Sequence, residues 1–261
     1  MKPNFAPVAL KNAGVELEEI IGIVCSPPYR VENFAHVSRL YRRIATGILL
    51  VSSDPRDFYR YLFNSSRAFL YFLEQVDDDK KVTSKATAYF DAVACRDREG
   101  ERRLAAASRH TLNPGLEYEE DFAYVSILMR RCSLEASMQE VEGPLDEWEG
   151  LLAGNLDPRF AVVKALVTAD QAAFDDAIKE AVKQLVKARD LALEAEQLHP
   201  DEASTSSRIS VEVLAWIELA ERAGLRVARE YTLAPSAARL FHRIDFPPPD
   251  DWQHPSGFAT L

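Results

Sequence analysis

The sequence predicts an all-α protein of roughly eight to ten helices, packed as antiparallel hairpins in a repeat-like bundle. Apolar residues recur three and four positions apart through most of the chain, and this spacing gives a helix one buried side. The alternation of apolar and polar residues that is typical of a strand is nearly absent. An aspartate followed by a proline, a pair that begins helices, occurs at two boundaries of the apolar pattern.

Two amphipathic helices are expected over 34–48 and 58–76, each with one apolar stripe. Asp54 and Pro55 stand between them. The carboxylate can accept hydrogen bonds from the free N–H groups of a first helical turn, and proline fits the first position, where no N–H is needed. The next segment, 80–109, is charged and less regular, and could be a loop between two shorter helices.

The middle of the chain is divided by turn residues. Asn113, Pro114 and Gly115 predict a turn, after which apolar residues from 122 to 132 predict a helix. Glu142, Gly143 and Pro144 are expected to break the helical pattern, because proline lacks the N–H that a helix interior requires. A short helix over 145–152 should follow.

Two helices with aspartate caps are expected next. One begins at Asp157 and Pro158, and the other is capped by Asp170 and extends to about Leu198, before His199 and Pro200 end it.

A polar stretch over 201–207 precedes a helix over 209–220, which Gly224 ends, because glycine adopts the left-handed conformation without a side-chain clash. A last helix is expected from Pro235 through Leu240 and Phe241. We expect the chain to form a single all-helical domain, 1–261, or two packed halves, 30–110 and 116–245, with an extended C-terminal tail, 246–261, lying on the surface.

The composition is that of an ordinary globular protein, with 47% hydrophobic and 28% charged residues. No apolar run approaches the roughly 20 residues of a membrane-spanning helix. Glu16, Glu18 and Glu19 stand where a signal peptide would need its apolar centre. Three widely spaced cysteines suit a reducing compartment. We therefore expect a cytoplasmic protein without a membrane partner.

No residue pattern for catalysis or cofactor binding is found. None of the five histidines has a second histidine or a carboxylate at zinc-ligand spacing. Asp77, Asp78 and Asp79 are followed by Lys80 and Lys81, whose charges would repel magnesium. Glycine-rich phosphate loops and the Gly-x-Ser-x-Gly turn are missing, and the net charge of −10 disfavours nucleic-acid binding. We expect no enzyme, metal, cofactor or nucleic-acid partner.

The net negative charge lies entirely in the second half. Residues 1–130 carry 18 Lys and Arg and 18 Asp and Glu, whereas 131–261 carry 13 and 23, and 132–158 contains seven acidic residues and no basic one. Apolar residues lie within this acidic run, and a patch that surrounds a central anchor with charge is typical of a binding surface. We therefore predict these partner-binding residues: Glu135, Glu140, Glu142, Asp146, Glu147, Trp148 and Glu149. The alternative is that Trp148 and Leu145 are core residues and the carboxylates are merely solvated.

Three helix-packing features occur together in 157–240. An alanine-rich helix leads to Ala169 and Asp170 and a partner helix with Phe174, a later helix ends in the stretch 219–227, and a segment with Pro235 follows. In these respects the stretch, about a third of the chain, resembles the immunity protein 49 family of bacterial polymorphic toxin systems. The resemblance implies an all-helical, cytosolic protein that binds and blocks a toxin encoded beside it.

Our first hypothesis is an immunity protein that neutralises a cognate toxin by stoichiometric binding. We expect the toxin to be basic, because an acidic inhibitor then associates quickly. The alternative is a helical-repeat adaptor that binds a peptide or partner helix in a groove lined by residues such as Tyr59, Tyr61 and Phe63. A third hypothesis is an all-helical enzyme with a metal site. The sequence does not indicate an oligomeric state.

Overall fold

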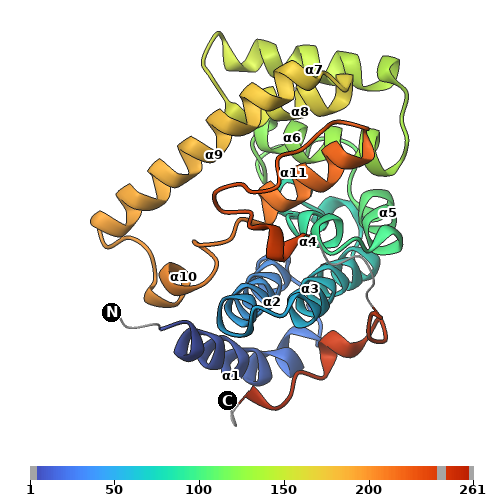
Figure 1. Cartoon of the computed structure of the whole chain (residues 1–261). Helices are drawn as coiled ribbons and strands as arrows, with labels where there is room; N and C mark the ends of the chain where they lie inside the picture. The colour runs from blue at the N-terminus through green and yellow to red at the C-terminus, as the bar shows by residue number, and fades with distance from the viewer. Residues whose placement is uncertain (1–4, 240–244, 259–261) are drawn as a thin grey trace.

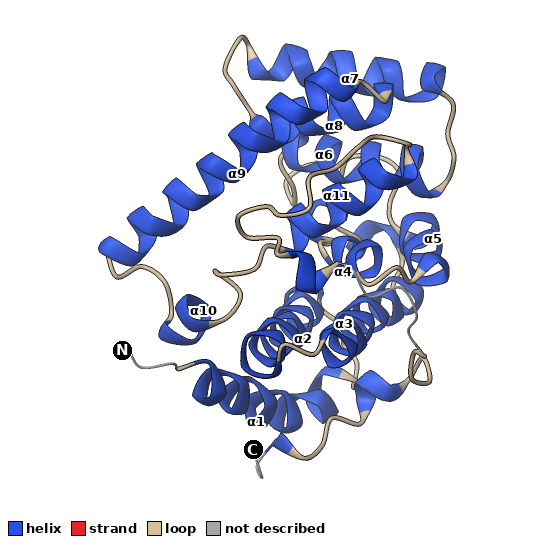
Figure 2. Ribbon diagram, viewed as in Figure 1, coloured by secondary structure: helices blue, strands red, loops and turns tan. Residues whose placement is uncertain are grey.

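The structure is a computed structural model that describes residues 5–239 and 245–258. Within these residues the chain forms eleven α-helices and no strand (Figure 2). The predicted all-α class is therefore confirmed.

The helices follow one another with short connections. Their bounds are α1 Ala6–Val24, α2 Val31–Ser52, α3 Pro55–Gln75, α4 Ala88–Ala94, α5 Arg98–Ala107, α6 Glu119–Leu128, α7 Met138–Leu152, α8 Pro158–Thr168, α9 Gln171–Glu194, α10 Pro200–Ser204 and α11 Val211–Arg222. A π-helical segment, η3 Met129–Ser133, continues α6. In Figure 1, α1 to α3 lie at one end of the molecule and α6 to α9 at the other, with α4, α5 and α11 between them.

The α2–α3 hairpin confirms the expected boundary between these helices. Ser53 adopts a left-handed conformation, with φ 58°, and Asp54 Oδ1 accepts a hydrogen bond from the Arg56 N–H at 2.9 Å. Pro55 occupies the first turn of α3. The carboxylate therefore fills the capping role that the sequence predicted.

The structure has a helix near the N-terminus, α1, in a segment to which the sequence analysis assigned no element. Its buried residues recur at helical spacing, namely Ala9, Leu10, Ala13, Leu17 and Ile21, and this side packs on α2. The ring of Phe258, near the C-terminus, lies so close to Gly14 that a Cβ there would overlap it.

The charged segment before α5 contains a helix with no exposed side. Every residue of α4 is buried, because α3, α5 and α11 all pack against it. Asp91 of α4 accepts hydrogen bonds from Arg42 at 2.7 and 2.8 Å and from the Ser65 hydroxyl at 2.6 Å. Burial raises the pKa of Asp91, although Arg42 and Ser65 oppose the rise.

Both predicted aspartate caps in the second half are confirmed. Asp157 accepts from the Arg159 N–H at 2.8 Å and Asp170 from the Ala173 N–H at 3.0 Å. The helix that Asp170 caps ends at Glu194 instead of near Leu198. The polar stretch that was expected to be a connection contains α10, which packs on α1.

The last part of the chain differs from its prediction. A 3-10 turn, Ser236–Ala238, follows Pro235, and Leu240 and Phe241 lie outside the described residues. Gly224, with φ 80°, follows the end of α11 as predicted.

Most of the described tail is at least partly exposed, but Trp252 and Phe258 anchor it in the core. Trp252 is 1% exposed and packs against Phe34 and Tyr71, at ring-centroid distances of 6.1 and 5.3 Å. Phe246 stacks on Phe63 at 4.6 Å. Burial of these large rings outweighs the preference of the proline-rich sequence for an extended, solvated chain.

Buried apolar side chains from α1 to the tail form one contiguous cluster. None of the helices in the described part of the chain is long and apolar enough to cross a membrane.

Candidate functional site

The acidic run lies mostly on α7, which continues through the expected break. Ser137 and Glu140 form a capping box at its start, and these hydrogen bonds lower the pKa of Glu140. The prediction that Gly143 and Pro144 end the helix is wrong. Proline leaves the Glu140 carbonyl without its helical donor, and Arg130 Nη2 donates to that oxygen at 3.0 Å instead. An arginine from another segment thus compensates for the missing N–H.

Three of the predicted acidic residues are already engaged within the chain. Glu135 precedes α7 and forms an ion pair with Arg102 at 3.3 Å, Glu149 pairs with Lys164 at 3.0 Å, and Glu140 belongs to the capping box.

The other three predicted carboxylates are free to meet a partner. Glu142, Asp146 and Glu147 are exposed, and none has a side-chain hydrogen bond or ion pair with a residue that the structure describes. Helical spacing places Glu142 and Asp146 on one flank of the buried stripe of α7 and Glu147 on the other. The acidic residues therefore share one helix but not one flank.

Trp148 is a core residue, and its prediction as an exposed anchor is corrected. Its side chain is 0% exposed and packs edge-on against Phe160 at 5.2 Å and against Tyr124 at 6.0 Å. Leu145, one turn earlier, is also buried. The reason is the spacing of Val141, Leu145 and Trp148, which lie on one side of α7 and face the neighbouring helices.

A cavity of about 660 Å³ lies where the loop before α6 meets α6 and α7. We call it the α7 cavity. Its lining is His110, Thr111, Leu112, Glu119, Phe122, Ala123, Ser126, Ile127, Arg130, Pro144, Glu147, Trp148, Gly150 and Leu151. Most of these side chains are apolar, and the indole N–H of Trp148 has no hydrogen-bond partner among the described residues. Small-molecule and side-chain anchors bind in cavities of this size and character.

Exposed apolar side chains accompany the cavity. Leu116 and Tyr118, in the loop before α6, are 55% and 79% exposed, and Leu151, in the cavity wall, is 41% exposed. Leu156, in the loop after α7, is 93% exposed. Glu119 and Glu147 add negative charge to the wall. The sequence analysis missed Glu119, Phe122 and Leu151 as site residues, because their contribution depends on two helices meeting.

The buried titratable groups near the cavity serve structural contacts. Tyr124 donates to Glu212 at 2.5 Å and accepts from the Trp216 indole at 2.9 Å, which ties α6 to α11. Burial raises the pKa of Glu212, despite the hydrogen bond from Tyr124 and the nearby charge of Arg159. Among the described residues, no group of three or more His, Cys, Asp or Glu is placed to hold a metal ion.

The residues proposed for an adaptor groove do not line one. Tyr59 and Phe63 are buried, and Tyr61 packs against the rings of Tyr41 and Phe258. Tyr59 donates from its hydroxyl to the Ala238 carbonyl at 2.8 Å. These aromatic side chains belong to the core because α3 is packed on several sides.

A family model described as immunity protein 49 matches residues 45–238, which is well over half of the chain. The matched range includes α7 and the whole α7 cavity but not α1 or the C-terminal tail. Comparisons with curated proteins and with solved structures give no match.

Proposed function

We propose, from the premise that the chain belongs to the immunity protein 49 family, that it binds and neutralises a cognate bacterial toxin in a stoichiometric, non-enzymatic complex. We further propose that this complex forms in the cytoplasm.

The α7 cavity, with the unpaired Glu147 in its wall and the unpaired Glu142 and Asp146 on the other flank of α7, is the observation that carries this proposal. Glu142, Asp146 and Glu147 attract a cationic surface and accelerate its encounter with the protein. The cavity offers a desolvated apolar site for a side chain of the partner. The toxin would thus present basic residues around an apolar anchor, and that anchor enters the immunity protein. The sequence analysis expected the opposite arrangement, in which Trp148 of this protein was the anchor.

Co-expression with the protein encoded by the neighbouring toxin gene tests the function directly. The chain should restore growth of cells that produce the toxin, and the two purified proteins should form a stable complex. Failure to restore growth with a toxin whose toxicity has been verified would contradict the proposed neutralisation.

Charge reversal tests the role of the free carboxylates. The triple variant Glu142→Lys, Asp146→Lys and Glu147→Lys should reduce the association rate constant about tenfold or more at low salt, since steering accelerates encounter by at least that factor. The difference should shrink at about 1 M salt, where the Debye length falls to about 3 Å. Glu194→Lys with Glu196→Lys, at the C-terminal end of α9, provides a control for charge reversal away from α7. An equal effect of the control would place the interface elsewhere.

A further inference from the structure

A second pocket has three arginines in its wall, although the protein as a whole has a net charge of −10. It has a volume of about 280 Å³ and lies where α5, η3, α8 and α11 meet. We call it the arginine pocket. Its lining is Arg98, Arg131, Cys132, Glu135, Leu166, Ala169, Leu219, Arg222 and Ala223. Three guanidinium groups and one carboxylate stand in this lining, and Glu135 is paired with Arg102 outside the pocket.

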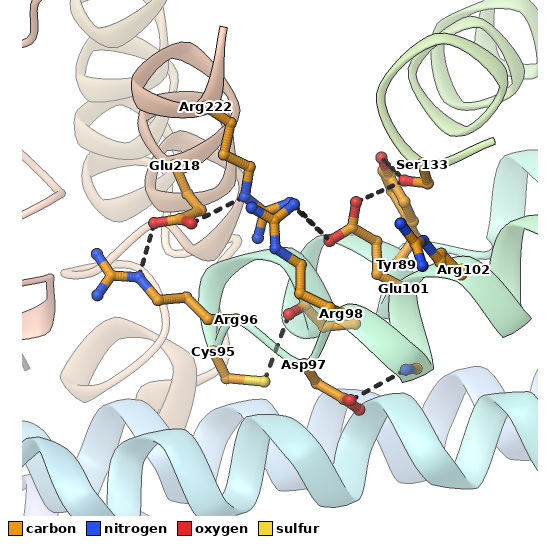
Figure 3. A network of polar contacts seen from close by, with 12 residues as sticks. Tyr89, Cys95, Arg96, Asp97, Arg98, Glu101, Arg102, Ser133, Glu218 and Arg222 are labelled. Atoms are coloured by element: carbon orange, nitrogen blue, oxygen red, sulfur yellow. Dashed lines mark hydrogen bonds and ion pairs between the residues drawn. The ribbon is translucent and has the colours of Figure 1, made fainter. Parts of the chain in front are cut away.

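Arg222 is held firmly in the pocket wall by two carboxylates. Its Nε donates to Glu218 at 2.8 Å and its Nη1 to Glu101 at 2.6 Å, as Figure 3 shows. Ser133 in turn donates to Glu101 at 2.6 Å. The remaining nitrogen, Nη2, is buried and has no hydrogen-bond partner among the described residues. The network therefore positions Arg222 without using all of its donors.

Arg131 is less satisfied than Arg222. Its side chain makes no hydrogen bond or ion pair with any residue that the structure describes, and its Nε is buried. A buried donor without a partner costs free energy, and a guanidinium cannot lose its charge to avoid that cost. A ligand that accepts hydrogen bonds would remove this cost.

Carboxylates behind the lining neutralise two of the arginines, since Arg222 pairs with Glu101 and Glu218 and Arg98 lies 4.0 Å from Glu101. Of the three, Arg131 alone has no ion pair with a described residue. Burial and, after it, the positive charge of Arg222 lower the pKa of Arg98, although Glu101 and Glu218 oppose the fall. Burial raises the pKa of Cys132 to about 12, so its thiol is uncharged at neutral pH.

The helix ends around the pocket do not use the free donors. The Ala165 and Leu166 carbonyls of α8 accept from the backbone of Asp170 and Ala169, and the Ala220 carbonyl of α11 accepts from Leu225. The arginines are therefore not occupied in capping these ends.

We propose that the arginine pocket binds the phosphate group of a small phosphorylated molecule. Guanidinium groups offer forked donors that match phosphate oxygens, and a phosphate supplies both the counter-charge that Arg131 lacks and an acceptor for Arg222 Nη2. The volume is near the lower limit of about 300 Å³ for small-molecule sites, which suits a phosphate with a short organic part. Leu166 and Leu219 provide apolar contact for that part.

Titration calorimetry with inorganic phosphate and with glycerol phosphate, at constant ionic strength maintained by chloride, tests this proposal on the full chain. Both probes should bind. Tighter binding of inorganic phosphate would indicate free phosphate as the natural ligand, and tighter binding of glycerol phosphate would indicate a phosphate ester. Malonate, a dianionic carboxylate, should bind more weakly. Equal binding of malonate, or no binding of either phosphate probe, would overturn the assignment.

Arg131→Gln should weaken phosphate binding about tenfold or more, because it removes hydrogen bonds from a charged donor. Arg103→Gln, which removes an exposed arginine of α5 outside this pocket, is the matched control and should leave binding unchanged. Without phosphate, Arg131→Gln should melt at the same temperature as the unmodified protein or higher, because it removes a charged group whose Nε is buried without a partner. A clear fall in melting temperature would instead assign Arg131 to the fold and refute the proposal.

Discussion

Replacing Gly150 with tryptophan should fill the α7 cavity without unfolding the protein. Gly150 lines the cavity in the last turn of α7, and a Cβ at this position would meet no atom within 4 Å. Glycine inside a helix costs roughly 0.5–1 kcal/mol relative to alanine, so a side chain here does not weaken the helix. The new indole can therefore occupy the cavity with little strain.

The same substitution should sharply reduce binding of the toxin. A side chain that anchors an interface contributes about 2 kcal/mol or more, and its exclusion raises Kd about 30-fold, since 1.4 kcal/mol corresponds to a factor of ten. Titration calorimetry measures Kd, circular dichroism melting confirms the fold, and growth rescue gives the functional result. Gln139→Trp, on α7 but outside the cavity lining, should leave Kd unchanged. A folded Gly150→Trp protein with unaltered Kd would refute the role of the cavity.

Three further predictions concern stability and pH. Asp91→Asn should lower the free energy of unfolding, measured with denaturant, by about 3–5 kcal/mol, because it leaves Arg42 without its buried counter-charge. The control Asp146→Asn, at an exposed site, should lower it by less than about 0.5 kcal/mol. Equal costs would show that the buried pair is unimportant. Trp252→Ala should cost about 3–5 kcal/mol, whereas a negligible loss would mean that the tail is not part of the core. Because the pKa of Glu140 is lowered in the fold, its contribution to stability is present above the pKa of the unfolded chain and is lost as pH falls through the folded value. The stability difference between the unmodified protein and Glu140→Gln should therefore shrink on acidification, measured as denaturant midpoints between neutral pH and about pH 3; a constant difference would contradict the capping role.

Much of the fold was predictable because its signals are local. Asp54, Asp157 and Asp170 cap helices through atoms two or three residues away, so the chain near each cap contains the whole signal. The predictions were wrong where residues far apart in the sequence interact. α7 passes through Pro144 because Arg130, from η3, donates to the Glu140 carbonyl.

The candidate site was predictable only in part. The acidic run correctly directed attention to α7, but the sequence could not separate Glu142, Asp146 and Glu147 from Glu149, because Lys164 on α8 engages the last of these. The prediction that Trp148 is an exposed anchor was wrong for a similar reason. An aromatic residue among carboxylates has the composition of an exposed anchor, and only the packing of Phe160 against it shows that it is buried.

The sequence by itself determined the helical class, most helix starts and the concentration of acidic residues after residue 130, since each depends on the order of neighbouring residues. Tertiary structure decided which of those carboxylates remain unpaired, that Trp252 of the tail packs beside α2 and α3, and where the α7 cavity and the arginine pocket form. Burial and pairing depend on distances between segments far apart in the chain. These distances are fixed only when the helices pack.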